Sequence, residues 1–264
     1  MNQKTILLTG ASGRIGRVLR KHLRNEYRLI LFNRSLIRDL SSNEILIRGD
    51  ITDNQAIENA AKDADIIVDM AAVSDVASFR DKLWHTNILG TYNIFEAARK
   101  ANVSRLIYAS THHTVGFYPA GQKIDESAEY RPDSMYGVTK CFAEATGQFY
   151  SQKAGLRVVC LRIGYFGEKP LDERHLAIWI SHRDMAQLTR CAIEAPDIEF
   201  EIVYGVSNNT RKWWDINNAR KILGYQPEDD AEIYAENLLK NPPEQWLARV
   251  KYQGGEKADL PFMP

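Results

Sequence analysis

Residues 5–16 read TILLTGASGRIG, an apolar run followed at once by glycines 10, 13 and 16 and then by a helical pattern. A strand, a glycine-rich turn and a helix in this order are typical of a dinucleotide-binding site. Gly10 allows a tight turn, Gly13 lets the backbone approach a pyrophosphate, and Gly16 lets the helix pack closely. The start of the helix offers unpaired N–H groups to the phosphates. The turn residues predicted to contact the cofactor are Gly10, Ser12, Gly13, Arg14, Ile15 and Gly16.

The same alternation of short apolar runs and longer helical patterns continues along the chain. Strands are predicted at residues 5–9, 28–32, 45–47, 66–70, 105–109 and 157–163, and helices at 14–24, 54–62, 134–154 and in a segment ending near 101. Strands that are apolar throughout are expected where helices cover both faces of a sheet. The sequence therefore predicts an α/β fold with a doubly wound parallel Rossmann sheet.

Beyond Gly164 the pattern loosens, and only a strand-like run at 201–204 and a helical pattern at 230–239 remain clear. We expect residues 1–164 to form an NAD(P)-binding Rossmann domain. Residues 165–264 are expected to form a small substrate-binding lobe and a C-terminal tail. The two parts together are predicted to make one compact unit.

The charge and cysteine content exclude several classes of partner. The 34 basic and 34 acidic side chains cancel, so no long-range field favours nucleic acid or an anionic membrane. The three cysteines are odd in number and far apart, which fits neither a disulfide framework nor a zinc site. The N-terminal apolar run is too short for a signal peptide or a membrane span. These features predict a cytoplasmic protein with a small-molecule substrate.

The choice between NAD and NADP is expected at the end of the second strand, where an acidic residue would bind the ribose hydroxyls of NAD. This chain has Asn33 and Arg34 there, and Arg14 in the glycine turn. The neutral amide and the two guanidinium groups suit a 2′-phosphate, so the sequence slightly favours NADP over NAD. Asp50 could accept from the adenine amine or cap the next helix. Ile51 and Ala71, near the ends of the third and fourth strands, are further predicted cofactor contacts.

Tyr136 and Lys140 are four residues apart in a predicted helix, so both side chains project from one face. A nearby ammonium group favours the phenolate and is expected to lower the tyrosine pKa toward the range of a general base. A hydroxyl at the end of the preceding strand could bind the same substrate oxygen. Of the two candidates, we expect Thr111 to do so, and Ser110 to satisfy backbone groups. Tyr136, Lys140 and Thr111 are the predicted catalytic residues.

His112 and His113 follow directly after this strand. They are candidates for substrate contacts or for the core of a loop. Neither has a carboxylate or cysteine partner at a spacing typical of a zinc site, so no metal is predicted.

The motifs TGASGRIG, AST and YGVTK resemble those of the extended short-chain dehydrogenase/reductase superfamily, also called the NAD-dependent epimerase/dehydratase family. Within it, the stretches STHHTVGFYP (110–119), RPDSMYGVTKCF (131–142), WISHRD (179–184), WWD (213–215) and YQGG (252–255) are most similar to bacterial uronate dehydrogenases. The resemblance implies oxidation of the anomeric carbon C1 of a hexuronic acid to a lactone by a homo-oligomeric enzyme.

By matching position, the resemblance also assigns roles to single residues. Tyr136 would be the base, with Lys140 as the partner that adjusts its pKa and binds the ribose, and Thr111 as the substrate hydroxyl ligand. Arg174 would bind the substrate carboxylate, a role that its planar donor fork suits. The substrate contacts implied overall are Ser74, Thr111, His112, His113, Tyr136, Tyr165 and Arg174.

Three positions depart from the pattern of the uronate enzymes. Asn33 replaces an acidic residue, so a preference for NAD does not carry over. His112 replaces an asparagine, and Tyr165 stands where a small residue is expected. A bulky Tyr165 would reshape the sugar pocket. The sequence therefore leaves a neutral aldose, a different sugar acid and a sulfonated sugar open as substrates.

Two other functions share part of this pattern. A nucleotide-sugar epimerase or dehydratase has the same cofactor fold and Tyr/Lys pair, but it needs a larger lobe than the residues after Gly164 provide. A redox sensor would bind NAD(P) without turnover, and such proteins typically lose the Tyr/Lys pair that this chain keeps.

Overall fold

The computed structural model describes residues 3–74, 78–240 and 250–261. Its centre is a seven-stranded sheet in the order β3-β2-β1-β4-β5-β6-β9, in which every pairing is parallel. These strands are β1 (Thr5–Thr9), β2 (Arg28–Asn33), β3 (Glu44–Arg48), β4 (Ile66–Asp69), β5 (Arg105–Thr111), β6 (Arg157–Ile163) and β9 (Phe200–Gly205). The order reverses between β1 and β4, where doubly wound sheets bind ligands at the carboxyl ends of the strands.

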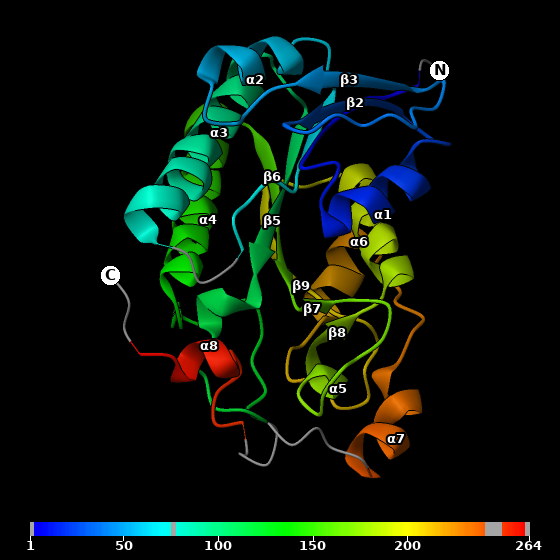
Figure 1. Ribbon diagram of the computed structural model, residues 1–264, viewed down its shortest axis with the longest axis vertical. Helices are drawn as coiled ribbons and strands as arrows, with labels where there is room; N and C mark the ends of the chain where they lie inside the picture. The colour runs from blue at the N-terminus through cyan, green and yellow to red at the C-terminus, as the bar shows by residue number, and fades with distance from the viewer. Residues whose placement is uncertain (1–2, 75–77, 241–249, 262–264) are drawn as a thin grey trace.

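Helices cover both faces of the sheet (Figure 1). One face carries α1 (Arg14–Leu23) and α6 (His182–Glu194), and the other carries α2 (Asn54–Ala61), α3 (Thr91–Lys100) and α4 (Met135–Ala154). Successive residues of β1 point to opposite faces, so Leu8 packs with Leu19 of α1 while Leu7 packs with Ile57 of α2. This two-sided burial explains why the strands are apolar throughout.

The predicted fold class is confirmed, and the strand bounds agree closely. β1 and β6 begin and end at the predicted residues, and the other predicted strands and helices differ by a few residues. The run predicted at 201–204 pairs with β6 as β9, so this part of the C-terminal segment completes the main sheet. The helical pattern at 230–239 is a short 3₁₀-helix, η4 (Ala231–Tyr234), continued by α7 (Ala235–Lys240).

The remaining elements lie outside the main sheet, and several of them are near the carboxyl ends of β5 and β6 (Figure 1). They include a two-stranded pair, β7 (Tyr165–Phe166) and β8 (Trp179–Ile180), which is separate from the main sheet. The others are the π-helices η1 (Phe79–Gly90), beside α3 and α4, and η3 (Ala219–Leu223), the 3₁₀-helix η2 (His112–Val115), and the short helices α5 (His175–Ile178) and α8 (Glu256–Asp259). None of the helices within the described ranges combines the length and the apolar character that crossing a membrane requires. Cys141, Cys160 and Cys191 are all free thiols.

Candidate active site

The glycine turn between β1 and α1 has the conformation that its sequence predicts. Gly10 has a φ of +61°, and a Cβ there would lie 2.9 Å from the carbonyl group of Met70. A Cβ on Gly16 would lie 2.2 Å from the carbonyl oxygen of Gly10, so only glycine allows α1 to pack this closely on the turn. Gly13 is the N-cap of α1 and supplies no side-chain cap, which leaves the first N–H groups of the helix directed at the turn.

A cavity of about 200 Å³ opens beside this turn at the carboxyl ends of the strands. Eight of the predicted cofactor contacts line it: Gly10, Ser12, Gly13, Asn33, Arg34, Asp50, Ile51 and Ala71. The glycine turn, which has no side chains at Gly10 and Gly13, and the uncapped start of α1 both fit a dinucleotide pyrophosphate. The site therefore fits the cofactor class that the sequence predicts.

Asn33 joins the turn to the loop after β2. Its Oδ1 accepts from the backbone N–H of Ser12 at 3.3 Å and from the Ser12 hydroxyl at 2.9 Å, and its Nδ2 donates to the Ser35 carbonyl at 2.8 Å. Arg34 is largely exposed and lies 3.6 Å from Asp50. The carboxylate of Asp50 accepts a hydrogen bond from the backbone N–H of Thr52, two residues further along the chain.

One of the two roles left open for Asp50 is excluded, and the predicted role of the Arg14 side chain is wrong. Asp50 does not cap the next helix, because the N-cap of α2 is Asp53, whose side chain accepts from the N–H of Ala56. The guanidinium of Arg14 does not face the ribose end of the cavity, because its Nη2 donates to the carbonyl oxygen of Phe166 at 2.7 Å. The part of Arg14 that remains a candidate cofactor contact is its backbone N–H, at the start of α1.

Thr111 and Tyr136 come together where β5 ends and α4 begins. Ser134 is the N-cap of α4 and accepts from the N–H of Gly137 at 3.1 Å. A Cβ on Gly137 would lie 2.5 Å from the carbonyl oxygen of His113, so glycine lets the start of α4 pack against η2. The Tyr136 hydroxyl is hydrogen-bonded to the side chain of Thr111.

Ser110, the other candidate hydroxyl, is committed elsewhere. It is buried, and its Oγ donates to Oε1 of Glu144 at 2.5 Å. Glu144 in turn pairs with the buried Arg162 at 2.8 Å. Thr111 is therefore the strand-end hydroxyl beside Tyr136.

Lys140 is buried, and its ammonium is hydrogen-bonded to two residues of β5. Its Nζ donates to the Ala109 carbonyl at 2.7 Å and to the Tyr108 hydroxyl at 3.0 Å, and lies 5.9 Å from the centre of the Tyr136 ring. Burial raises the pKa of Tyr136 to about 12, although its hydrogen bond with Thr111 opposes the rise. The predicted lowering of this pKa is therefore wrong for the protein alone, because desolvation of the phenolate outweighs the distant ammonium.

Asp69, at the end of β4, is a charged group that the sequence reasoning missed. Its residue is 1% exposed, and its carboxylate accepts hydrogen bonds from the Thr9 hydroxyl and from the N–H of Ala71. Burial lowers the pKa of Lys140 to about 8, and the charge of Asp69 opposes this fall. The only sequence signal was an aspartate ending the apolar run IIVD.

The two predicted histidines are buried and held in fixed orientations. Nδ1 of His113 lies 2.7 Å from Oδ2 of Asp133, and Nδ1 of His112 lies 3.0 Å from the carbonyl oxygen of Ile163. Burial lowers the pKa of both rings well below the usual value, so both are neutral at pH 7. A neutral ring that donates from Nδ1 has Nε2 as an acceptor.

Arg174 lies beside these histidines. Its Nη1 donates to the carbonyl oxygen of Gln253 at 3.0 Å and lies 3.5 Å from Nε2 of His112. Its charge contributes to lowering the pKa of both histidines. The structure thus brings the predicted carboxylate ligand close to the end of β5, although the two are far apart in sequence.

The remaining predicted contacts lie around this centre. The carbonyl oxygen of Ser74 accepts from Nζ of Lys257 at 2.8 Å, and the same ammonium lies 4.7 Å from the centre of the Tyr136 ring. Lys257, on α8, was not among the predicted residues, because nothing local in the sequence links it to Tyr136. Tyr165 lines a cavity of about 390 Å³ together with Arg14. Within the described parts of the chain, no three His, Cys, Asp or Glu side chains gather as metal ligands do.

Comparisons with known proteins agree with this geometry. Residues 6–219 match the model of the NAD dependent epimerase/dehydratase family. The chain is 36% identical over 253 residues to a uronate dehydrogenase of Pseudomonas putida, covering 95% of this chain and 94% of that protein. It is 31% identical to an L-arabinose 1-dehydrogenase (NAD(P)(+)) of Haloferax volcanii, covering 88% of this chain and 99% of that protein.

A solved structure extends the agreement to three dimensions. A uronate dehydrogenase of Agrobacterium tumefaciens, in a tyrosine-to-alanine variant complexed with NAD, superposes with a TM-score of 0.92 at 33% identity and covers 98% of both chains. The predicted resemblance is therefore confirmed over nearly the whole chain. The chain belongs to the NAD-dependent epimerase/dehydratase family, as one of its NAD-dependent dehydrogenases.

Proposed function

We propose that this enzyme oxidises the anomeric C1 hydroxyl of a hexuronic acid to a lactone. The observation that carries the proposal is the grouping of Tyr136 and Thr111 with Arg174, a cation that burial partly removes from water. The grouping offers a hydroxyl-binding end at Thr111 and Tyr136 and a carboxylate-binding end at Arg174, linked by the His112 and His113 rings. The names of the uronate dehydrogenase relatives support the same substrate class.

The carboxylate of the sugar binds Arg174. The guanidinium offers paired donors that match a carboxylate, and partial burial strengthens each charge-assisted hydrogen bond. His112 and His113 border this end, where Nε2 of His112 lies 3.5 Å from Nη1 of Arg174 and Nε2 of the neutral His113 ring is an acceptor for a sugar hydroxyl. Asp133 fixes the orientation of His113.

The reacting hydroxyl binds between Thr111 and Tyr136. Thr111 donates to the substrate oxygen, and Tyr136 accepts the proton that leaves it as the carbonyl of the lactone forms. Lys140 holds its ammonium 5.9 Å from the centre of the tyrosine ring, and the charge of Asp69 opposes the fall that burial causes in the pKa of this ammonium. Bound NAD or NADP would supply the acceptor for the hydride that leaves C1.

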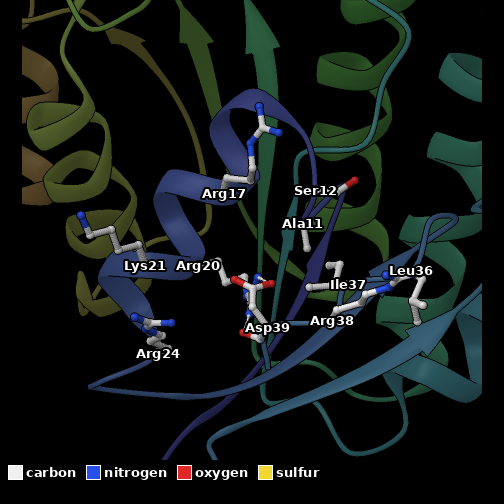
Figure 2. Close-up of a pocket in the computed structure, with 10 residues that line it drawn as sticks. All are labelled: Ala11, Ser12, Arg17, Arg20, Lys21, Arg24, Leu36, Ile37, Arg38 and Asp39. Atoms are coloured by element: carbon white, nitrogen blue, oxygen red, sulfur yellow. Dashed lines mark hydrogen bonds and ion pairs between the residues drawn. The ribbon is translucent and has the colours of Figure 1, made fainter. Parts of the chain in front are cut away.

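We further propose that the enzyme accepts NADP as well as NAD. A basic groove of about 540 Å³ adjoins the cofactor cavity, and Ser12 lines both. Figure 2 shows Arg17 of α1 and Arg38 of the loop after β2 in this groove, with Ala11 and Ser12 between them. The nearby Arg20 is neutralised by Glu44 and Asp39. Together with Arg34 and the neutral Asn33, these cations suit a 2′-phosphate.

Replacing Asn33 with aspartate tests this cofactor assignment. Asn33→Asp should lower the ratio of kcat/KM for NADP to that for NAD by about 100-fold, because like charges brought together cost several kcal/mol. Steady-state kinetics with both cofactors measures the ratio. Arg34→Ala is the companion variant and should weaken the binding of NADP while leaving the binding of NAD unchanged. A wild type that never reduces NADP would contradict the proposal.

The substrate class is tested by following reduced-nicotinamide absorbance with galacturonate, glucuronate and neutral aldoses, each with NAD and with NADP. Rapid reduction with a uronate, and slow reduction with the matching neutral aldose, is the expected result. Reduction with neutral aldoses alone would contradict the sugar-acid assignment. No cofactor reduction with any of the sugars would favour the epimerase or the sensor function.

We also propose that residues 165–264 include the substrate-binding lobe and that the enzyme is a cytoplasmic homo-oligomer. Val138, Phe142 and Phe149 are exposed along one face of α4, and Trp84 on η1 and Tyr92 on the adjoining α3 are about half exposed. A second copy would cover these apolar side chains. Sedimentation of the purified protein measures the assembly.

A further inference from the structure

The glycine turn is tied to the C-terminal segment by a contact that we name the Arg14 clasp, formed by Arg14, Tyr165 and Phe166. Nη2 of Arg14 donates to the carbonyl oxygen of Phe166 at 2.7 Å, between residues 152 positions apart. Burial raises the pKa of Tyr165, and the charge of Arg14 and a hydrogen bond from it oppose the rise. One guanidinium therefore holds both residues of β7.

The clasp continues through a ring stack. The ring of Tyr165 lies flat on that of His175, with centroids 3.5 Å apart and planes 10° apart. A Cβ on Gly167 would lie 2.9 Å from the Tyr165 ring, so glycine at this position leaves room for the tyrosine. The Trp179 indole closes the loop by donating to the carbonyl oxygen of Gly167 at 2.8 Å.

His175 is fixed on its other side as well. Its ring Nδ1 accepts from the backbone N–H of Leu171 at 3.2 Å, and its backbone N–H donates to Oδ1 of Asp172 at 2.6 Å. Burial lowers the pKa of the ring to about 2, so it stays neutral and stacks without an ion pair. Arg174 directly precedes this anchored ring, at the start of α5.

We propose that Arg14 is a positioning residue for Arg174, acting through Tyr165 and His175. The residue that the glycine motif places at the cofactor turn thus sets the place of the group that binds the substrate acid. The inference rests on the proposed sugar-acid substrate, because Arg174 matters only if the substrate carries an anion. It also makes Tyr165 part of the support for Arg174, where the sequence predicted a direct contact with the sugar.

Arg14→Gln tests the proposal, because glutamine is shorter and uncharged and cannot hold both residues of β7. The expected result is a rise of about tenfold in KM for the uronate, since a small misplacement of a binding group weakens binding strongly. The value of kcat should stay near that of the wild type, as should KM for a neutral aldose and the dissociation constant of NAD. Gly167→Ala should give the same pattern from the other end of the clasp, by displacing the Tyr165 ring.

Lys169→Gln is the matched control, since Lys169 is an exposed cation that lines the same cavity as Arg14. It should leave every kinetic constant unchanged. Amide hydrogen exchange provides a readout that needs no substrate: residues 165–175 should exchange faster in Arg14→Gln and not in Lys169→Gln.

The outcomes separate the possible failures. A higher dissociation constant for NAD in Arg14→Gln, with unchanged exchange at 165–175, would make Arg14 a cofactor ligand and overturn the proposal. An equal loss for uronate and neutral aldose would make the clasp a general structural support and would also overturn it. A wild type that oxidises no uronate would contradict the proposed function, while the exchange measurement would still decide whether Arg14 holds the segment.

Discussion

Tyr136→Phe should lower kcat for sugar oxidation by about 1,000-fold, because loss of a general base costs about 10²–10⁴-fold. The ring and its packing remain, so only the hydroxyl that bonds Thr111 is lost. Cofactor affinity should stay unchanged, which calorimetric titration with NAD measures. A variant that keeps most of its turnover would show that another group accepts the proton.

The wild type should carry a matching pH dependence. Burial raises the pKa of Tyr136 to about 12, so the small phenolate fraction grows as pH rises, and oxidation should accelerate with it. The increase should level off near the pKa of Lys140, which burial lowers to about 8, because deprotonation removes the ammonium that favours the phenolate. Tyr136→Phe should lose this rising limb.

Arg174→Met should lower kcat/KM for a uronate by about 100-fold, since a charge-assisted hydrogen bond to a charged group is worth about 1.5–3 kcal/mol. Methionine keeps the apolar stem and removes the guanidinium. The contact with the Gln253 carbonyl is lost as well, so thermal stability must be measured in parallel.

The matching neutral aldose is the control for Arg174→Met. Its kcat/KM should stay the same or improve, because no carboxylate has lost its partner. Arg174→Lys should fall between the two, as lysine keeps the charge without the paired donors. An equal loss for acidic and neutral sugars would remove the role of carboxylate ligand from Arg174.

Much of the fold could be predicted from local patterns in the sequence. Strands buried on both faces are apolar at every position, so β1 and β6 were placed at their true bounds. The run at 201–204 was also found, but its place in the main sheet depends on pairing with β6, which no local pattern encodes. Predicting that place needs the packed sheet.

In the candidate site too, local features could be predicted from the sequence and tertiary contacts could not. The spacing of Tyr136 and Lys140 placed both on one helix face, yet it could not reveal that burial dominates the pKa of the tyrosine. Side chains that cross the fold were missed or misplaced: the glycine motif suggested a cofactor role for Arg14, whose guanidinium instead reaches Phe166. Lys257 approaches Tyr136 from the other end of the chain. Such contacts follow from tertiary packing, since residue spacing carries no trace of them.

In the proposed reaction, hydride leaves C1 of a sugar acid. We would incubate the enzyme with galacturonate and glucuronate carrying deuterium at C1, and measure deuterium in the reduced cofactor by mass spectrometry. We expect one deuterium in each reduced cofactor and a lactone as the sugar product. Reduced cofactor without deuterium, or an epimerised sugar with no net reduction, would contradict the proposed reaction.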